Sequence, residues 1–403
     1  MARTVFRGGR VFDGSADLAS VDVAVEDGRI VAVGPGLDAD EAVDLAGRAV
    51  LPGLFDCHTH VMMGPEALDT NVELETPFSY WFYAAIDNLR RTLDIGITTV
   101  RDAGLADLGL KMAVADGRIA GPRLYISTAI LSQTGGHADG WLPSGFDLSP
   151  RTWPGMPSGI VDGPDEMRRR AREIIRAGAD QIKVCTSGGV LSPRDDPRHG
   201  HFRDAELDVL VEEANAASIP VMAHAQGAPG IKSAIRAGIR SIEHGIFLDD
   251  QAIEMMLERG TWLVPTLVAP QGVLDAAAAG AAIPPASLRK AREVIGIHRD
   301  AVRKAIAAGV KVAMGTDSGV TPHGQNLREL ALMVECGMSP LDAMLATTRS
   351  AAELMRVEDD LGTIEAGKRA DLVVVDGDPF DYADLAERVR AVYQDGRLVS
   401  GAV

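Results

Sequence analysis

The sequence predicts an α/β fold in which a (β/α)8 TIM barrel carries a small composite β-sandwich domain. Eight short β-branched runs alternate with helical patterns through the middle of the chain, as expected for parallel strands with crossover helices. Hairpin-like segments occur only near the two ends, and the 403 residues exceed the roughly 250 that one such barrel needs. We therefore expect residues 56–359 to form the barrel, and residues 1–55 with 360–403 to form the composite domain.

The barrel prediction depends on eight strand candidates and the helices between them. The candidates are residues 50–56, 98–102, 123–131, 181–185, 220–223, 241–243, 261–266 and 311–315. A helix is expected to begin at Asp204, because Leu207, Leu210 and Val211 follow at a spacing near 3.6 residues. Another is expected over residues 164–177, ahead of Gly178. Eight successive alternations favour a closed barrel over an open sheet.

Short strands separated by turn residues make up the rest of the chain. They are expected at residues 4–10, 21–25, 30–33, 43–50, 371–375, 389–394 and 397–400. The dipeptides Asp27-Gly28 and Asp395-Gly396 are typical of two-residue hairpin turns, in which both residues have positive φ. We therefore expect antiparallel half-sheets from the two ends to join in one domain.

Charge and cysteine content exclude several classes of protein. Forty Lys and Arg stand against 57 Asp and Glu, and the net charge of -17 disfavours nucleic acid and anionic membrane surfaces as partners. No stretch offers 18 uninterrupted apolar residues, so no membrane span is expected. The three cysteines form no C-x-x-C pair and leave one unpaired, which argues against a disulfide framework. A cytoplasmic protein fits these features best.

Two long loops follow predicted strands and are expected on the face where the strands end. Residues 132–163 contain seven Gly, four Pro and the aromatic residues Trp141, Phe146 and Trp153. The second loop spans residues 188–202. Long loops are commonly lids or binding loops, and disorder is the alternative. The aromatic residues favour a functional role, because disordered segments are poor in them.

Six potential metal ligands stand where predicted strands end. They are His58, His60, Lys183, His224, His244 and Asp317. Singly, each has an ordinary explanation, such as a hydrogen-bonded histidine, a helix cap or an exposed lysine. Together they indicate a metal site, because four of only nine histidines stand at the ends where a barrel carries its active site.

Lys183 requires separate treatment, because a protonated amine with a reference pKa of about 10.4 cannot bind a cation. Two explanations remain open. The side chain could point away from the other ligands, or the neutral amine could have reacted with carbon dioxide to form a carbamate. A carbamate would offer an anionic bridge of two oxygens between two ions.

The chain resembles the amidohydrolase superfamily along essentially its whole length. The resemblance lies in residues 51–60, LPGLFDCHTH, in the strand-end ligands from Lys183 to Asp317, and in residues 361–373, LGTIEAGKRADLV. It implies that His58, His60 and Asp317 hold one metal ion and that His224 and His244 hold another. Carboxylated Lys183 and a hydroxide would bridge the two ions. The ligand types suggest zinc, although manganese, cobalt and iron accept the same ligands.

Within this superfamily the chain is most similar to the imidazolonepropionase-related, Xaa-Pro dipeptidase-like group. The similar segments are residues 187–193, 195–197 and 135–137. The group implies a homo-oligomer that acts on small amide substrates. One departure is Gln226, because relatives often have Tyr or His at the position two residues after the ligand equivalent to His224.

These assignments suggest a mechanism. Two close cations would lower the pKa of a shared water, and Asp317 is the expected proton shuttle. His137 is a candidate donor to the substrate carbonyl, or a residue that only stabilises its loop. The candidates for binding the substrate, with a solvated loop as the alternative for the last three, are Gln226, Arg194, Arg198 and His199.

The sequence thus predicts a binuclear hydrolase of an amide bond in an Xaa-Pro or Xaa-Arg dipeptide or an N-acyl amino acid. A cyclic amide, a carbamate or a lactone are alternative substrates. A mononuclear deaminase is a second hypothesis, but residues 225–229, AQGAP, lack the expected glutamate and Lys183 would have no role. A non-catalytic scaffold is the third, although such a protein should have lost ligands.

Overall fold

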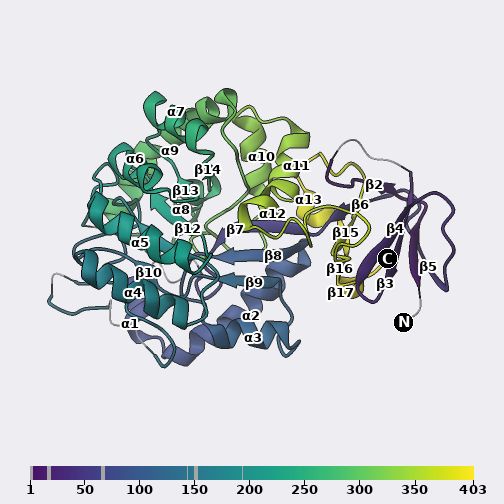
Figure 1. Cartoon of the computed structure of the whole chain (residues 1–403), viewed down its shortest axis with the longest axis horizontal. Helices are drawn as coiled ribbons and strands as arrows, with labels where there is room; N and C mark the ends of the chain where they lie inside the picture. The colour runs from purple at the N-terminus through teal and green to yellow at the C-terminus, as the bar shows by residue number, and fades with distance from the viewer. Residues whose placement is uncertain (1–2, 16–19, 65–68, 143, 149–152, 193) are drawn as a thin grey trace.

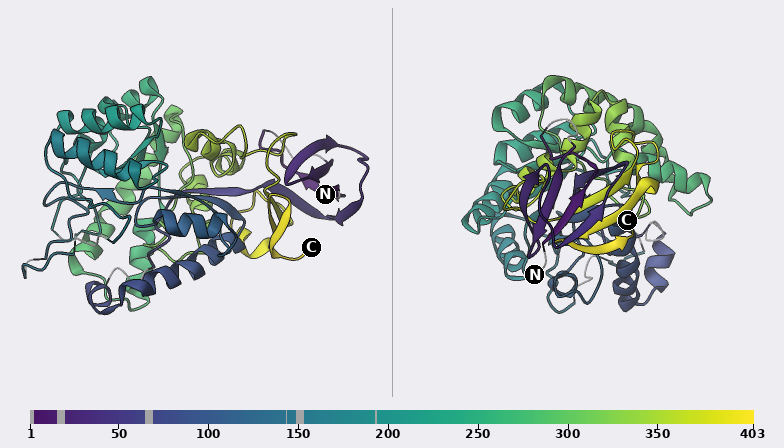
Figure 2. Two further views of the ribbon diagram at one scale, coloured as in Figure 1. Left: turned by 60° about the horizontal axis from the view of Figure 1, so that its bottom comes forward. Right: turned by 90° about the vertical axis from the view of Figure 1, so that its right-hand side faces the viewer.

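The computed structural model describes residues 3–15, 20–64, 69–142, 144–148, 153–192 and 194–403, and it has two parts. The larger part consists of parallel strands surrounded by helices, and the smaller part consists of two β-sheets. Strands from the beginning and the end of the chain lie together in the smaller part in each view (Figures 1 and 2).

Parallel strands in chain order form the centre of the larger part. The strands are β7 (Leu54–Thr59), β8 (Ile97–Asp102), β9 (Arg123–Ile126), β10 (Ile130–Leu131), β11 (Ile182–Cys185), β12 (Val221–Ala225), β13 (Ser241–His244) and β14 (Trp262–Val264). One sheet has the order β7-β8-β9 and the other the order β10-β11-β12-β13-β14. Because neighbours are parallel, their carboxyl ends lie at one edge, where ligands bind in such folds.

The third predicted strand, residues 123–131, is two short strands. β9 pairs with β8, whereas β10 pairs with β11. Between them Thr128 has a φ of 57°, a left-handed conformation that interrupts a β-ladder. This backbone turn divides the parallel strands between two sheets.

The eighth predicted strand, residues 311–315, forms no strand of its own, yet it lies between β14 and β7. The backbone N–H of Leu263 donates to Lys311 O at 2.8 Å, and that of Ala313 donates to Leu263 O at 3.0 Å. On the other side, Cys57 N–H donates to Met314 O at 2.9 Å. The segment therefore connects the outer strands of the two parallel sheets.

Helices cover the outside of these strands (Figure 1). They are α1 (Thr70–Glu75), α2 (Phe78–Asp94), α3 (Leu108–Ala115), α4 (Pro164–Arg176), α5 (Asp204–Ala216), α6 (Ala228–Ala237), α7 (Asp250–Arg259), α8 (Val268–Ala278), α9 (Pro285–Ala308), α10 (Arg328–Glu335), α11 (Pro340–Ala346) and α12 (Arg349–Met355). The helix predicted from Asp204 is α5, and its residues Leu207, Leu210 and Val211 are buried as expected. No helix in the described ranges is long and apolar enough to cross a membrane.

Strands from both ends of the chain pair in the smaller part. They are β1 (Thr4–Arg7), β2 (Arg10–Val11), β3 (Asp22–Glu26), β4 (Arg29–Gly34), β5 (Glu41–Asp44), β6 (Arg48–Pro52), β15 (Leu372–Asp376), β16 (Val389–Gln394) and β17 (Arg397–Gly401), with the short helix α13 (Leu385–Arg388). One sheet has the order β4-β3-β1-β5, and the other, β17-β16-β15-β6-β2, combines both ends. Phe6 packs against Tyr393 edge to face, with ring centroids 4.9 Å apart.

The sheets of the smaller part are mixed, which corrects the expectation of purely antiparallel sheets. β1 pairs with β5, and β2 with β6, in parallel. The hairpins were predicted correctly: Asp27 and Gly28 have φ of 48° and 79°, and Asp395 and Gly396 have φ of 48° and 72°. The parallel pairs arise because other segments of the chain separate the two strands of each pair, and the second strand then runs in the same direction as the first. Turn residues alone do not predict such a connection.

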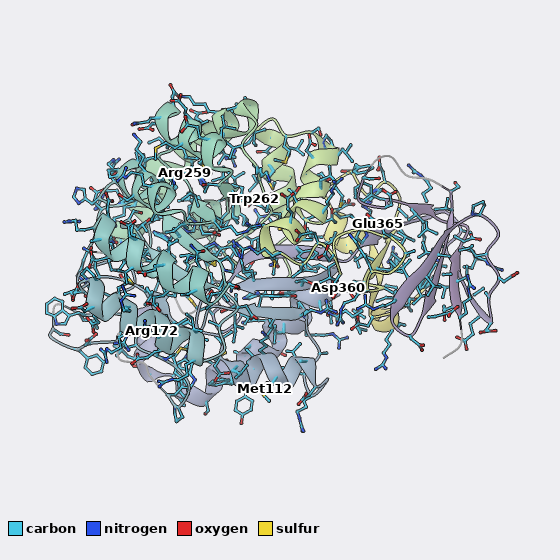
Figure 3. The ribbon with its side chains drawn as sticks, viewed as in Figure 1. Met112, Arg172, Arg259, Trp262, Asp360 and Glu365 are labelled. Atoms are coloured by element: carbon cyan, nitrogen blue, oxygen red, sulfur yellow. The ribbon has the colours of Figure 1, made fainter. Side chains whose placement is uncertain are left out.

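An ion pair and a close backbone approach join the two parts. Asp360, labelled in Figure 3 where the parts meet, belongs to the smaller part and accepts a hydrogen bond there from Arg29 of β4 at 2.9 Å. Arg123 of β9 donates to Asp371 at 2.9 Å. Gly53, the one residue between β6 and β7, has no room for a side chain, since an added Cβ would lie 2.1 Å from Thr98 Oγ1.

We predict that Gly53→Ala destabilises the protein by about 1–3 kcal/mol, because the added methyl group overpacks this junction. Gly34→Ala is the matched control, since an added Cβ there meets nothing within 4 Å. Urea unfolding of the two variants and the wild type measures the difference. Equal midpoints for the two variants would contradict this description of the junction.

Candidate metal centre and its cavity

A cavity of about 370 Å³ lies at the carboxyl ends of the parallel strands. All six predicted ligands line it: His58, His60, Lys183, His224, His244 and Asp317. They come from β7, β11, β12, β13 and the segment after residue 315. The structure therefore brings together side chains that are up to about 260 positions apart in the chain.

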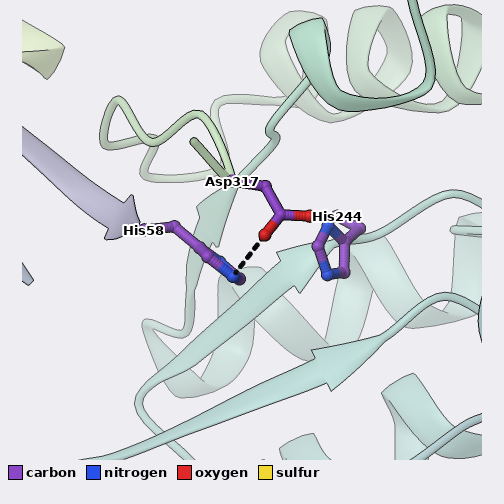
Figure 4. A group of neighbouring side chains, drawn as sticks. All are labelled: His58, His244 and Asp317. Atoms are coloured by element: carbon purple, nitrogen blue, oxygen red, sulfur yellow. Dashed lines mark ion pairs between the residues drawn. The ribbon is translucent and has the colours of Figure 1, made fainter. Parts of the chain in front are cut away.

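Asp317 lies between the two histidines that end β7. Its Oδ1 is 3.4 Å from His58 Nε2 and 3.2 Å from His60 Nε2. Burial raises the pKa of this carboxyl group, but nearby His58, His60 and Lys183 lower it by more. The resulting pKa is about 2. Asp317 is consequently a carboxylate, which is the form that binds cations. Figure 4 shows it directed toward His58 and His244.

The other two histidines complete the cluster. His224 Nδ1 is 2.8 Å from His244 Nε2. One potential ligand atom from each of His244, His58 and Asp317 lies within 4.8 Å of the others. Burial first, and then nearby Lys183 and other histidines, hold the pKa of His58, His224 and His244 well below the usual range. These rings are neutral, as metal ligands must be.

Lys183 points into the same cluster. Its Nζ is 3.0 Å from His58 Nε2, and the residue is only 2% exposed. The alternative of a lysine turned away from the ligands is therefore wrong. Burial lowers the pKa of the amine, although Glu243 and other acidic groups oppose the shift.

Each of the four histidines uses its other ring nitrogen for a bond to the protein. His58 Nδ1 bonds Glu243 at 2.7 Å, and His244 Nδ1 bonds Thr266 Oγ1 at 2.7 Å. His60 Nδ1 bonds the backbone carbonyl of Gly104 at 3.4 Å, and His224 Nε2 bonds that of Gly188 at 3.1 Å. Such bonds fix which nitrogen faces the cluster, as is usual for histidines that bind metals.

The support behind His58 was not predicted from the sequence. Arg101 of β8 donates to both carboxylate oxygens of Glu243, at 2.9 and 3.1 Å, and to Ser241 Oγ at 3.1 Å. All three side chains are buried. A signal was present, because an arginine and a glutamate inside predicted buried strands need partners.

The backbone is left-handed at three residues around the cavity. φ is 71° at His244, 52° at Thr266 and 62° at Asp317. Uncommon conformations of this kind concentrate at functional sites, where surrounding contacts maintain them. Here the N–H of Asp317 donates to His58 O at 2.7 Å, which holds the two ligand-bearing segments together.

The predicted substrate residues are divided between the cavity and the surface. His137 and Gln226 line the cavity. Arg194, Arg198 and His199 are exposed and do not belong to its lining in the described part of the chain. The Arg194 guanidinium lies over the ring of Trp141 and that of Arg198 over Phe247, at 5.9 and 5.0 Å from the ring centroids.

Apolar side chains form one wall of the cavity, a feature that the sequence did not reveal. They come from the loop after β11, the loop after β13, α8, the loop before α9 and the loop after Asp317: Val190, Leu191, Ile246, Val273, Ile283 and Val320. Apart from Lys183, the described lining contains no lysine or arginine. We call these six residues the apolar wall.

Comparisons with known proteins agree with this geometry. Residues 49–402 match the model of the amidohydrolase family. Ochratoxinase of Aspergillus niger is 36% identical over 371 residues, which cover 87% of this chain and 76% of that protein. Imidazolonepropionase of Rhizorhabdus wittichii is 29% identical over 387 residues, 88% of this chain and 87% of that protein.

Solved structures extend the comparison to the fold. A Xaa-Pro dipeptidase with methionine bound in its active site superimposes with a TM-score of 0.89 and 35% identity, over 98% of this chain and 99% of that one. Such neighbours imply a TIM barrel with a small additional domain. The predicted resemblance and the prediction of a hydrolase for carbon–nitrogen bonds are confirmed, and the chain belongs to the amidohydrolase family.

Proposed function

We propose that the protein is a binuclear metal-dependent hydrolase of an amide bond in a small substrate, namely a dipeptide such as Xaa-Pro or an N-acyl amino acid. The observation that carries this proposal is the convergence of four histidines, an aspartate and a buried lysine at one cavity. Four imidazole rings, each with one nitrogen bonded to the protein outside the cluster and the other facing the centre, form a donor set suited to divalent cations.

The residues divide into two sets of ligands. In the proposal, His58, His60 and Asp317 hold one ion, and His224 and His244 hold the other. Lys183, as a carbamate, would bridge the two, and its position 3.0 Å from His58 supports this assignment. Imidazole and carboxylate ligands favour zinc, which we propose as the metal.

When bound, two such ions would polarise the substrate carbonyl and make a water acidic enough to lose a proton near neutral pH. Asp317 then accepts that proton on a carboxylate oxygen and passes it to the leaving nitrogen. His137, which also lines the cavity, hydrogen-bonds the substrate through its ring and so orients it beside these groups. The proposal thus gives the transfer of the proton to Asp317 and the orientation of the substrate to His137.

The apolar wall determines which substrates fit. A charged side chain buried against it without a partner would be strongly disfavoured, whereas an apolar one would gain from burial. We therefore propose that the substrate presents an apolar group to this wall, and we favour Xaa-Pro and apolar N-acyl amino acids over Xaa-Arg. The methionine bound in the similar Xaa-Pro dipeptidase is an apolar residue of this kind.

Several finer features belong to the same proposal. We propose that the two parallel sheets and residues 311–315 form one closed (β/α)8 barrel over residues 56–359, with residues 1–55 and 360–403 as the composite domain. The homo-oligomer and the cytoplasmic location also stay predictions. All three cysteines are free, which is in keeping with a reducing compartment.

We predict that the protein binds two zinc ions per chain and that Lys183→Ala lowers both zinc content and kcat, the latter by ~10²-fold. Short carboxylates such as formate should restore part of the activity, because they can occupy the place of the carbamate. Lys304→Ala is the matched control, since this side chain is 63% exposed. Full activity of Lys183→Ala without added carboxylate would refute the bridge, and one zinc per wild-type chain would favour a mononuclear deaminase.

We also predict that kcat/KM for N-acetyl-methionine exceeds that for N-acetyl-arginine and N-acetyl-glutamate by about 10²-fold or more, because burial of an unpaired charge is unfavourable. Val273→Ala should lower kcat/KM for the methionine substrate by about tenfold, since it removes methyl groups from the apolar wall. Val302→Ala, a buried control outside the cavity lining, should leave the selectivity unchanged. Preference for a charged substrate would contradict this part of the proposal.

A further inference from the structure

Asp195, in the loop between β11 and α5, is a buried carboxylate that does not line the cavity. Its side chain is 4% exposed. It accepts hydrogen bonds from Gly189 N–H at 3.1 Å and from the hydroxyl of Ser192. Its Oδ2 also lies 3.5 Å from Nδ1 of His137. A carboxylate with these partners ties the loop to the ring of His137.

Lys290 of α9 anchors this carboxylate from the other side. Its ammonium group lies 3.3 Å from Asp195 Oδ1 and donates to the carbonyls of Gly189 and Ser192 at 2.9 and 2.7 Å. The side chain is 11% exposed, so water screens these bonds little. Lys290 therefore holds both the Asp195 carboxylate and the backbone of this loop in place.

The ring of His137 is closely confined. It stacks on His224, with centroids 4.0 Å apart and planes inclined by 14°. Gly189 also approaches so closely that an added Cβ would lie 2.1 Å from Cε1 of the ring. Nδ1 is 2.8 Å from Ser192 Oγ, whereas Nε2 forms no hydrogen bond with any described residue.

The direction of these hydrogen bonds follows from the carboxylate. A hydroxyl can donate or accept, so Ser192 alone would not determine which nitrogen of His137 carries the proton. An ionised carboxylate only accepts, and it takes the hydroxyl hydrogen of Ser192. Ser192 Oγ must then accept from Nδ1–H. Although burial raises the pKa of Asp195, His137, Ser192 and Lys290 lower it to about 2, so the carboxylate persists at neutral pH.

We propose that Asp195, anchored by Lys290, is a positioning residue that acts through Ser192 to hold the proton of His137 on Nδ1 and to turn Nε2 toward the substrate. The inference rests on the proposed function, because Nε2 is the ring atom that would meet the substrate. With the proton on Nδ1, Nε2 can only accept a hydrogen bond, so His137 would bind an N–H group of the substrate and would not donate to its carbonyl oxygen. Asp195 itself touches no reacting atom. Its contribution is to fix the orientation of a ring that does.

The kinetic test compares Asp195→Asn with Asp196→Asn in the zinc-loaded protein. Asp196 carries the same substitution one residue away, and its carboxylate bonds Arg198 instead of His137. We expect Asp195→Asn to lower kcat about 10- to 100-fold with little change in KM, because the ring loses its productive orientation. Asp196→Asn should resemble the wild type, and zinc content should be unchanged in both.

A double mutant distinguishes positioning from a general structural effect. If Asp195 acts through His137, His137→Gln with Asp195→Asn should lose no more activity than His137→Gln alone. Independent, additive losses would overturn the proposal. Ser192→Ala breaks the same connection by removing only a hydroxyl, and it serves if Asp195→Asn fails to fold.

A spectroscopic measurement tests the proposal without relying on activity. In protein with ¹⁵N-labelled histidine, the ring signals that disappear in His137→Gln belong to His137. We expect these signals to show a proton on Nδ1 in the wild type, to shift in Asp195→Asn and to stay in place in Asp196→Asn. Unchanged signals in Asp195→Asn would overturn the inference. If the wild type hydrolyses no amide, the proposed function fails while this measurement still decides the role of Asp195.

Discussion

The structure depends on one constraint, which is that each polar side chain buried at the cavity needs a hydrogen-bond partner or a cation for every donor and acceptor atom. Four imidazole rings, one carboxylate and one amine lie there, largely removed from water. Each imidazole has one nitrogen bonded to the protein, which leaves the other nitrogen directed toward the cluster. Burial of such groups is unfavourable unless they bond to something, and divalent cations meet that need.

The arrangement of parallel strands makes this cluster possible. Because β7, β11, β12 and β13 run in the same direction, their carboxyl ends carry ligands to one place. Left-handed backbone at His244, where β13 ends, and at Asp317, just after residues 311–315, redirects these two side chains. Buried charges below the cluster, from Arg101 and Glu243, hold His58 in turn. The strands thus determine where the side chains of the cluster lie, and local departures from regular backbone determine where they point.

The sequence predicted the parts of this arrangement that follow from periodicity and from strand ends. The six candidate ligands, which the structure brings to one cavity, were identified because residue type and position coincide there. The turn at Thr128 inside the third predicted strand, and the irregular backbone of the predicted strand 311–315, were not expected, since β-branched residues look the same whether or not they join a ladder. Arg194 and Arg198 resembled binding residues by charge alone, but the fold places them over the rings of Trp141 and Phe247. The apolar wall could not be predicted because its residues come from five separate segments.

The central claim is that two metal ions share this cavity with a carboxylated lysine. Anomalous diffraction at the zinc absorption edge, from crystals of the zinc-loaded protein, tests it directly. We predict two peaks about 3.5–4 Å apart, one beside His58, His60 and Asp317 and the other beside His224 and His244. Electron density for a carboxyl group should extend from Lys183 Nζ. An unmodified Lys183, or the absence of a peak between β7 and β12, would contradict the account.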